Sequence, residues 1–333
     1  MIKKKIILLI TIILINGCFN NTIENKQFNI ENLSSPHLIN ESINNGINFL
    51  YKSQLEYGEF KTYACKDKKM TNCYFDSSPF ITTFVLYSIK NIQNNKVKIM
   101  TNNSIKFLLS EVETGGIWKY WTSRNLKQIN PDLDNITTIS HTLMSNQIEF
   151  ENNINIIQNN KNREGLFLTW LNMSLEDNDI DCIVNTNTLL YLNENNPKIC
   201  NYINNAIKNN EKCSIYYPDE LSLYYTVSRA FINNISCLNK NKNRIINRIL
   251  SKKKDNGSFG NSLQTAFAIN TLINYDYTGT EINQGIEYLI KTQKKNGSWP
   301  KETFFIDSEN FYGSEELTTS ISIEALNKYL FLI

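Results

Sequence analysis

One spacing occurs repeatedly along this chain of 333 residues and limits what the chain can fold into. In its clearest copy, KTQKKNGSWP, Gln293 is followed four residues later by Gly297 and two residues after that by Trp299. Three further copies that we align with it have the glycine and the aromatic residue at the same spacing, namely Gly58–Phe60, Gly116–Trp118 and Gly257–Phe259. The place of Gln293 is taken there by Gln54, Val112 and Lys253. Four matches at one spacing indicate an internal repeat, whose copies are units of supersecondary structure.

The intervals between the glycines predict the number of repeats. Gly58 and Gly116 are 58 residues apart, Gly257 and Gly297 are 40 apart, and Gly116 and Gly257 are 141 apart, which is three steps of 47. Two degenerate copies therefore fit into the long interval. We expect them at REGLFLTWLN and around CSIYYPDELSLYY, which makes six repeats over residues 40–333.

Each repeat combines two kinds of helical pattern. An amphipathic segment leads into the glycine–aromatic turn, and a segment with apolar or small residues on most sides follows after a loop. A helix that is apolar nearly all round is buried, whereas an amphipathic helix keeps one face in solvent. Six such pairs predict an all-α (α/α)6 toroid, with six inner helices inside six outer helices. The expected inner helices are 77–89, 131–144, 179–192, 219–231, 262–273 and 314–330.

Residues 1–17 are expected to lie outside the folded domain. They begin with basic residues and continue with an apolar run that is short for a membrane span, as in a signal peptide. The run ends in INGC and resembles a bacterial lipoprotein signal, which implies cleavage before Cys18 and a lipid on that residue. Residues 18–39 would then be the lipidated cysteine with a flexible tether, and residues 40–333 a single domain. The resemblance implies an exported protein anchored to the cell membrane, on its periplasmic or extracellular face. An ordinary signal peptide and an uncleaved anchor stay open as alternatives.

Net charge and cysteine content indicate which partners, disulfides and bound groups to expect. The formal net charge of +2 gives no indication of a nucleic-acid partner. In an exported protein disulfides are plausible, and we expect Cys65–Cys73 across a short polar loop. Antiparallel packing of two helices would likewise bring Cys200 next to Cys237. A metal site would need more histidine than the two in the chain, and no glycine-rich phosphate loop is present, so we expect neither metal nor cofactor.

The repeated motif resembles the QW repeats of the terpenoid cyclase and prenyltransferase toroids, which include the squalene–hopene cyclases. The resemblance covers about residues 43–331 and implies a central cavity at one end of the toroid. It also implies a chemistry, because class II cyclases carry Asp-x-Asp-Asp at the start of an inner helix and protonate an alkene or epoxide with the middle acid. Two segments match this motif at every position except the last acid. PDLDN has Asp132 and Asp134 but Asn135 at the last position, and DIDC has Asp179 and Asp181 but Cys182 there.

By this resemblance Asp134 or Asp181 is the candidate proton donor, and Asp132, Asp179 and His141 are supporting candidates. A carboxylic acid can protonate an alkene only when burial keeps it neutral and neighbouring polar groups make its proton available. Because the last acid of the motif is replaced, catalytic activity stays open. Helix capping is the alternative role, since aspartate at a helix start stabilises the helix by about 0.5–2 kcal/mol.

Polar and aromatic side chains near these acids are expected to line the cavity. Thr138 and His141 follow Asp134 on one helix face, and Asn185 follows Asp181 on another. In a cyclase, aromatic faces stabilise carbocations, whereas in a glycan-binding toroid the same rings would stack on sugars. The aromatic residues expected there are Trp121, Trp170, Tyr217, Tyr225 and Tyr312. Further aromatic residues, among them Tyr120, Tyr216 and Phe305, cluster near the same loops.

Three hypotheses about function follow. The first is a membrane-anchored isoprenoid cyclase that acts by protonation, or a degenerate relative of one. The second is a non-catalytic toroid that binds a lipid, glycan or protein at its acidic, aromatic mouth, and the third is a glycan hydrolase or lyase on an α/α barrel. A zinc site like that of protein prenyltransferases would need Asp181, Cys182 and His141, whose spacing does not match that family. We expect a monomer whose partner is an isoprenoid or another apolar small molecule.

Overall fold

In the computed structural model, which describes residues 34–333, two kinds of helix alternate along the chain. The helices buried on nearly every side are α2 (Pro79–Ile89), α4 (Leu133–Ser145), α6 (Cys182–Leu192), α8 (Glu220–Ile232), α10 (Ser262–Asn274) and α12 (Glu315–Leu330). The helices with an exposed face are α1 (Pro36–Ser53), α3 (Asn95–Ser110), α5 (Ile154–Asn159), α7 (Pro197–Asn209), α9 (Lys242–Ser251) and α11 (Thr280–Thr292). A short 3-10 helix, η1 (Ser236–Asn241), precedes α9.

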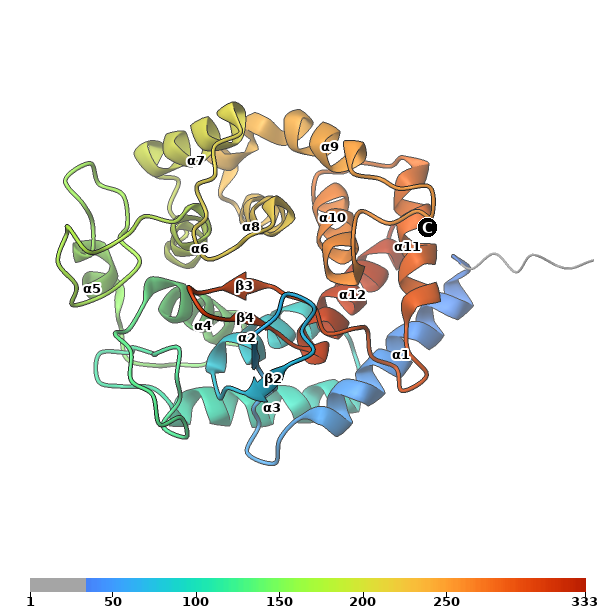
Figure 1. Cartoon of the computed structure of the whole chain (residues 1–333), viewed down its shortest axis with the longest axis horizontal. Helices are drawn as coiled ribbons and strands as arrows, with labels where there is room; N and C mark the ends of the chain where they lie inside the picture. Colours follow the sequence, from blue (N-terminus) through green and yellow to red (C-terminus); the bar gives the residue numbers. More distant parts are fainter. Residues whose placement is uncertain (1–33) are drawn as a thin grey trace, which may run out of the picture. The chain divides into compact units, whose positions relative to one another are not determined.

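The buried helices form a closed ring (Figure 1). Each packs against the next one along the chain from α2 to α12, and α12 packs against α2. The helices with an exposed face lie around the outside of this ring (Figure 1). The predicted mostly helical, toroid-like fold is confirmed, and the expected inner helices coincide with the ring helices to within a few residues.

The glutamine, glycine and aromatic residues of the repeated motif join neighbouring outer helices. Gln293 Nε2 donates to the carbonyl oxygens of Ser42 in α1 and of Gly297, each at 2.9 Å. The indole of Trp299 is fully buried and donates to the carbonyl oxygen of Leu289 at 2.8 Å. The first copy makes the corresponding bonds from Gln54 to Gly58, Met100 and Ser104.

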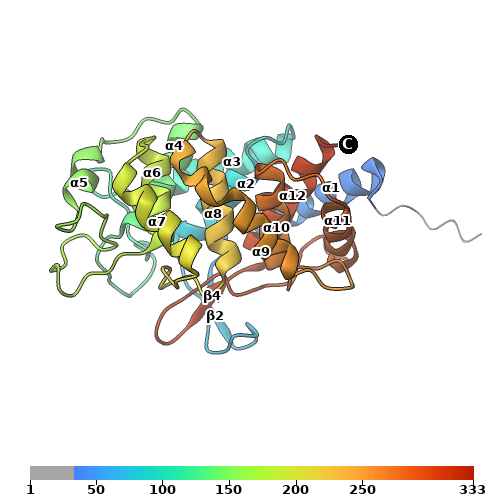
Figure 2. The ribbon, with the colours of Figure 1, turned by 90° about the horizontal axis from the view of Figure 1, so that it is seen from above.

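A small antiparallel sheet, which the all-α prediction did not include, lies at one end of the ring (Figure 2). Its strands are β1 (Tyr63–Cys65), β2 (Cys73–Phe75), β3 (Phe305–Ile306) and β4 (Phe311–Gly313), in the order β2-β1-β4-β3. The central pairing joins Tyr63 to Gly313 and Cys65 to Phe311. These strands are two or three residues long, too short for a period in the sequence to reveal them. The pairing of β1 with β4 also joins segments from almost opposite ends of the chain.

Three disulfides connect loops and helices. Cys65 is bonded to Cys73, across β1 and β2, and Cys200 is bonded to Cys237, with Cα–Cα distances of 4.0 and 5.9 Å. A third bond, between Cys182 and Cys213 with Cα atoms 5.4 Å apart, was not anticipated from the sequence. It attaches the loop before α8 to the start of α6.

Helix α1 begins at Pro36, inside the segment predicted to be a flexible tether. Proline suits the first turn of a helix because it has no N–H to leave unpaired. Ile39 in this turn and Ile43 one turn further along are buried. The predicted signal peptide and Cys18 lie outside the described residues. Of the helices in residues 34–333, none has both the length and the apolar character that crossing a membrane requires.

Candidate functional site

The β3–β4 hairpin forms one side of a cavity of about 170 Å³. The other walls come from the starts of α2, α4 and α6 and from the loops before α4, α6 and α8. Carboxyl groups enter the wall from Asp132, Asp134 and Asp307. The aromatic lining residues are Phe80, Tyr120, Trp121, Trp170, Tyr216, Tyr217, Phe305 and Tyr312.

Asp134, in the first turn of α4, lies in this wall and is 8 % exposed. One carboxyl oxygen accepts a hydrogen bond from Asn187 Nδ2 of α6 at 2.7 Å, and the other accepts one from the Tyr217 hydroxyl. Burial raises the pKa of Asp134, and the bonds from Tyr217 and Asn187 oppose that rise. Asp134 is therefore a buried acid whose carboxylate form is already provided with two hydrogen-bond donors.

A buried arginine, Arg229, contacts Asn187, one of the two residues that donate to Asp134. Arg229 of α8 donates from Nη2 to Asn187 Oδ1 at 2.5 Å, so it reaches Asp134 through the amide of Asn187. The guanidinium carbon also lies 4.9 Å from the ring centre of Tyr87 and 5.4 Å from that of Phe84. The positive charge of Arg229 stabilises an ionised Asp134.

Asp132 lies in the cavity wall but acts as a helix cap. It is the N-cap residue of α4 and accepts from the backbone N–H and the side-chain amide of Asn135, both at 2.8 Å. Burial raises the pKa of Asp132 to about 7, and the neighbouring Asp134 adds to the rise. The residue that replaces the last acid of the motif, Asn135, thus orients Asp132.

The second acidic pair does not reach the cavity. Asp181 is completely buried at the N-cap of α6 and accepts from the N–H groups of Ile183 and Ile215, both at 2.6 Å. Burial raises its pKa to about 7. Asp179 instead accepts from the Tyr216 hydroxyl at 2.5 Å and from Trp170 Nε1 at 3.2 Å, and so holds two aromatic wall residues. Of the two proposed proton donors, only Asp134 lines the cavity.

Other predicted residues lie elsewhere. Thr138 and His141 line a separate cavity of about 10 Å³, and burial lowers the pKa of His141 to about 3. Asn185 bonds to the backbone of Phe167, and the Tyr225 hydroxyl donates to Glu324 at 2.7 Å. Trp121, Trp170, Tyr217 and Tyr312 do line the main cavity.

The residues of the zinc alternative do not meet as a metal site. Cys182 is bonded to Cys213, and His141 lies in the smaller cavity. Among the described residues, no three His, Cys, Asp or Glu side chains form a group that could hold a metal ion.

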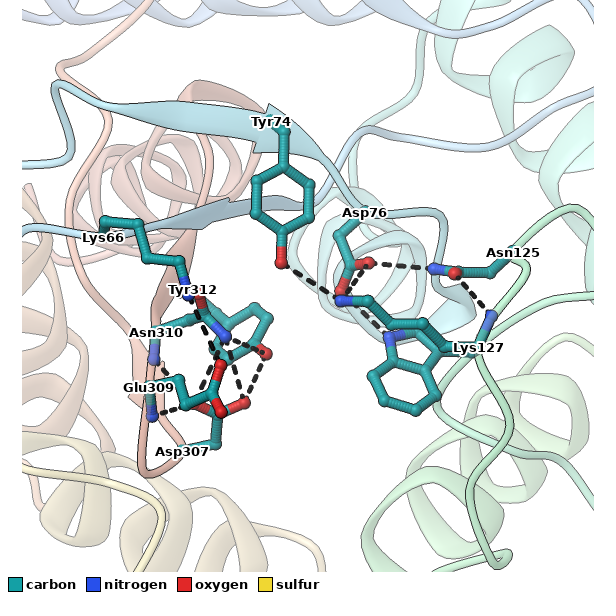
Figure 3. A network of polar contacts seen from close by, with 10 residues as sticks. Lys66, Tyr74, Asp76, Asn125, Lys127, Asp307, Glu309, Asn310 and Tyr312 are labelled. Carbon is teal, nitrogen blue, oxygen red and sulfur yellow. Dashed lines mark hydrogen bonds and ion pairs between the residues drawn. The ribbon is translucent and has the colours of Figure 1, made fainter.

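Two networks of polar side chains hold aromatic residues of the cavity wall in place (Figure 3). Asp76 accepts from Trp121 Nε1 at 3.0 Å and from Asn125 at 2.8 Å, and Lys127 lies 3.6 Å from the same carboxylate. On the hairpin, Asp307 accepts from the Tyr312 hydroxyl at 2.6 Å. Although burial opposes it, this bond and those from the backbone of the hairpin turn lower the pKa of Asp307.

The β3–β4 hairpin is the main element of the site that the sequence analysis missed, although its Phe305 and Tyr312 are among the aromatic residues expected near the cavity. Phe305, Ile306 and Asp307 line the cavity. The available signal was FFIDSENFYG, in which two short aromatic segments flank a polar, turn-forming DSEN. The remaining unpredicted lining residues, Phe80, Ile129, Thr169 and Val184, have no distinguishing pattern in the sequence.

Comparisons with known proteins support the fold. No protein family and no curated protein matches the sequence. Among solved structures, the type II terpene cyclase MstE from Scytonema is similar, with a TM-score of 0.67 and 12 % identity over 89 % of this chain and 99 % of that chain. A protein from Actinoplanes has a TM-score of 0.68 and 12 % identity over 88 % and 99 % of the two chains. An alpha-amylase from Clostridium perfringens has a TM-score of 0.58 and 12 % identity over 86 % and 98 %.

These similarities show a toroid fold that enzymes of different chemistry share. Variants of MstE have been solved with geranylgeranyl dihydroxybenzoate as substrate and with merosterolic acid A as product. At 12 % identity the likeness extends to the fold and not to the reaction.

Proposed function

We propose that this protein is an (α/α)6 toroid of the terpenoid cyclase type that binds an isoprenoid in the aromatic cavity and protonates it at Asp134. The observation that carries the proposal is the position of Asp134, a buried acid in the wall of a cavity lined by eight aromatic residues. The isoprenoid substrate and product of the structural neighbour MstE are consistent with such a ligand.

The surroundings of Asp134 suit a proton donor in two ways. Burial favours the neutral acid before reaction, because it disfavours a charge in an apolar environment. When the proton moves to a carbon of the alkene, the remaining carboxylate is stabilised by the Tyr217 hydroxyl and the Asn187 amide, which are already in place. The carbocation that forms on the other carbon of the alkene would be stabilised by the faces of the aromatic wall.

A non-catalytic isoprenoid-binding toroid is the second candidate, and one observation favours it. The two donors at Asp134 and the charge of Arg229 also stabilise an ionised carboxylate in the resting protein, and an ionised carboxylate has no proton to give. The replacement of the last acid of the motif by Asn135, which bonds to Asp132, removes a further proton source. The glycan hypothesis has support from fold similarity alone.

Co-purification distinguishes these candidates. Full-length wild type and the isosteric Asp134→Asn variant are purified from the same host, extracted with organic solvent and compared by mass spectrometry. For an enzyme, we expect the variant to carry an uncyclised isoprenoid and the wild type to carry its cyclised product or none. The same uncyclised isoprenoid in both proteins would indicate the binding function, and no isoprenoid in either would contradict the proposal.

We also propose that the protein acts from the membrane surface as a monomer. The predicted lipid on Cys18 would place the cavity close to apolar substrates dissolved in the bilayer. This part of the proposal depends on the N-terminal sequence and is independent of the chemistry at Asp134.

A further inference from the structure

Besides the Tyr120 hydroxyl, two polar atoms of cavity-lining residues, both on segments that meet at Asp134, have no hydrogen-bond partner among the described residues. They are Oδ1 of Asn135 and the hydroxyl oxygen of Thr169, in side chains that are 3 % and 2 % exposed. Both residues line the aromatic cavity. A buried polar group without a partner costs about 1–3 kcal/mol, so such atoms point to a ligand or a water as their partner.

The two atoms belong to segments that meet at the acid. The N–H of Leu133 donates to the carbonyl oxygen of Thr169 at 2.8 Å, which fixes the loop before α6 against the first turn of α4. Asn135 lies one residue beyond Asp134 in that turn, and its amide nitrogen is already bonded to Asp132. The free Oδ1 can therefore only accept a hydrogen bond, whereas the Thr169 hydroxyl can donate or accept one.

We infer that the ligand carries an uncharged hydroxyl group close to the double bond that Asp134 protonates. A hydroxyl is the small group that matches both atoms, because it donates to Asn135 Oδ1 while accepting from the Thr169 hydroxyl. A plain alkene would leave both atoms unpaired. The inference rests on the proposed function and specifies its substrate class as an isoprenoid alcohol.

The charges around the cavity oppose a diphosphate in the same place. The wall contains three carboxyl groups and no lysine or arginine. The two lysines labelled in Figure 3 are already paired with carboxylates: Lys66 lies 3.4 Å from Glu309, and Lys127 lies 3.6 Å from Asp76. A diphosphate group in the cavity would therefore lose its hydrating water without gaining a lysine or arginine of the wall as a partner.

Binding of matched ligands tests the inference. The probes are an acyclic monoterpene hydrocarbon, the same molecule with one terminal methyl oxidised to a hydroxymethyl group, and geranyl diphosphate. Quenching of tryptophan fluorescence reports binding to the full-length protein, because two of the four tryptophans, Trp121 and Trp170, line the cavity. We expect the alcohol to bind about tenfold more tightly than the hydrocarbon, and the diphosphate to bind more weakly than either.

A variant of Thr169 tests whether these atoms cause the preference for the alcohol over the hydrocarbon. Thr169→Val removes the hydroxyl and keeps the shape of the side chain. We expect the alcohol's advantage to fall to about twofold, because the alcohol loses a partner and the hydrocarbon no longer leaves that hydroxyl unpaired. Thr226→Val is the matched control, because Thr226 is buried in α8 and bonds only to the Ser222 carbonyl. If the hydrocarbon and the alcohol bind wild type equally, the two atoms are merely hydrated and the inference is wrong, although the proposed function stands. If no probe binds, it is the proposed function that fails.

Discussion

Asp134 and Asp181 occupy similar positions at the starts of neighbouring ring helices, yet their partners differ. Asp181 accepts only from backbone N–H groups, which is the bonding pattern of a helix cap. Asp134 accepts from two side chains. It does not cap α4, because Asp132 is the N-cap residue of that helix. Of the two acids of PDLDN, Asp132 therefore caps the helix, whereas Asp134 has no capping role and is the acid of the proposed function.

The raised pKa values predict how stability depends on pH. Burial raises the pKa of Asp181 from 3.8 to about 7 in the folded protein, so the folded state binds a proton more tightly than the unfolded state between these values. This contribution to stability is complete below pH 4 and is lost as the pH rises through 7. Burial likewise raises the pKa values of four other acids to about 7 in the folded protein, namely Glu59, Asp132, Glu302 and Glu316. We therefore expect a lower urea midpoint at pH 8 than at pH 5.

Asp181→Asn isolates one of these groups. Asparagine can still cap α6 but carries no charge, so the variant should gain stability relative to wild type as the pH rises from 5 to 8. Asp67→Asn is the control, because hydrogen bonds, chiefly from the backbone of Asn72, lower the pKa of Asp67, and it stays ionised across this range. A relative stability of Asp181→Asn that does not change with pH would contradict the assignment.

The sequence alone could not separate these acids. Both pairs have the same Asp-x-Asp spacing at the start of a buried helix, and the difference lies in what the next loop presents. Tyr217 reaches Asp134 with its hydroxyl, whereas the backbone of Ile215 in the same loop reaches Asp181. Such contacts join residues tens of positions apart and have no local pattern.

At the scale of elements, the turns of the repeated motif depend on close contact between outer helices. Gly297 has a φ of +91°, and a Cβ atom there would collide with the carbonyl oxygen of Asn45 in α1. Gly165 also has a positive φ, of +85°, but a Cβ atom there would meet only the flexible side chain of Lys198.

Alanine substitution of these two glycines should therefore differ. Gly165→Ala adds backbone strain alone, of about 1 kcal/mol, whereas Gly297→Ala also forces α1 and α11 apart and should cost at least about 3 kcal/mol. Urea unfolding of the two variants measures the difference. Equal losses of stability would show that the contact with Asn45 is unimportant.

The Cys182–Cys213 bond connects the stability of the domain to the site. The loop that it attaches to α6 carries Tyr216 and Tyr217, both of which line the cavity. Closing a loop of this length stabilises the folded state by about 3–4 kcal/mol on the chain-entropy account. The double variant Cys182→Ser, Cys213→Ser should lose about this much stability and also bind the probes more weakly.

A matched double variant provides the comparison. Cys200→Ser, Cys237→Ser removes a bond of similar sequence separation that joins α7 to η1 and does not hold the loop with Tyr216 and Tyr217. It should lose a similar amount of stability and keep its affinity. If both double variants bind the probes as wild type does, the disulfide does not position the site.

The sequence predicted the helical elements better than the sheet. Long apolar or amphipathic periods of 10 to 18 residues identify helices, as in α1 with 18 residues and α12 with 16. The sheet has strands of two or three residues, which carry no period. As a result, the acids at the start of α4 and aromatic residues of the nearby loops were anticipated at the cavity, whereas the hairpin that brings Ile306 and Asp307 to it was not.

At the scale of the whole molecule, membrane attachment by Cys18 stays a prediction of the sequence. Replacing Cys18 by serine removes the proposed acceptor of the lipid, so Cys18→Ser should move from the membrane fraction to the soluble fraction and lose labelling by radioactive palmitate. A variant that remains in the membrane fraction would indicate an uncleaved N-terminal anchor instead. Equal recovery of the two proteins from both fractions would indicate an ordinary signal peptide.

Deuterium incorporation tests the central claim most directly, which is that Asp134 protonates an isoprenoid in the aromatic cavity. Wild type and Asp134→Asn are incubated in heavy water with a panel of acyclic isoprenoid hydrocarbons and alcohols, and the products are analysed by mass spectrometry. Because the carboxyl proton exchanges with solvent, we predict a cyclic product that carries one deuterium on carbon from wild type, and at least about 100-fold less from the variant. No cyclic product from any substrate, or the same deuterated product from Asp134→Asn, would contradict the claim.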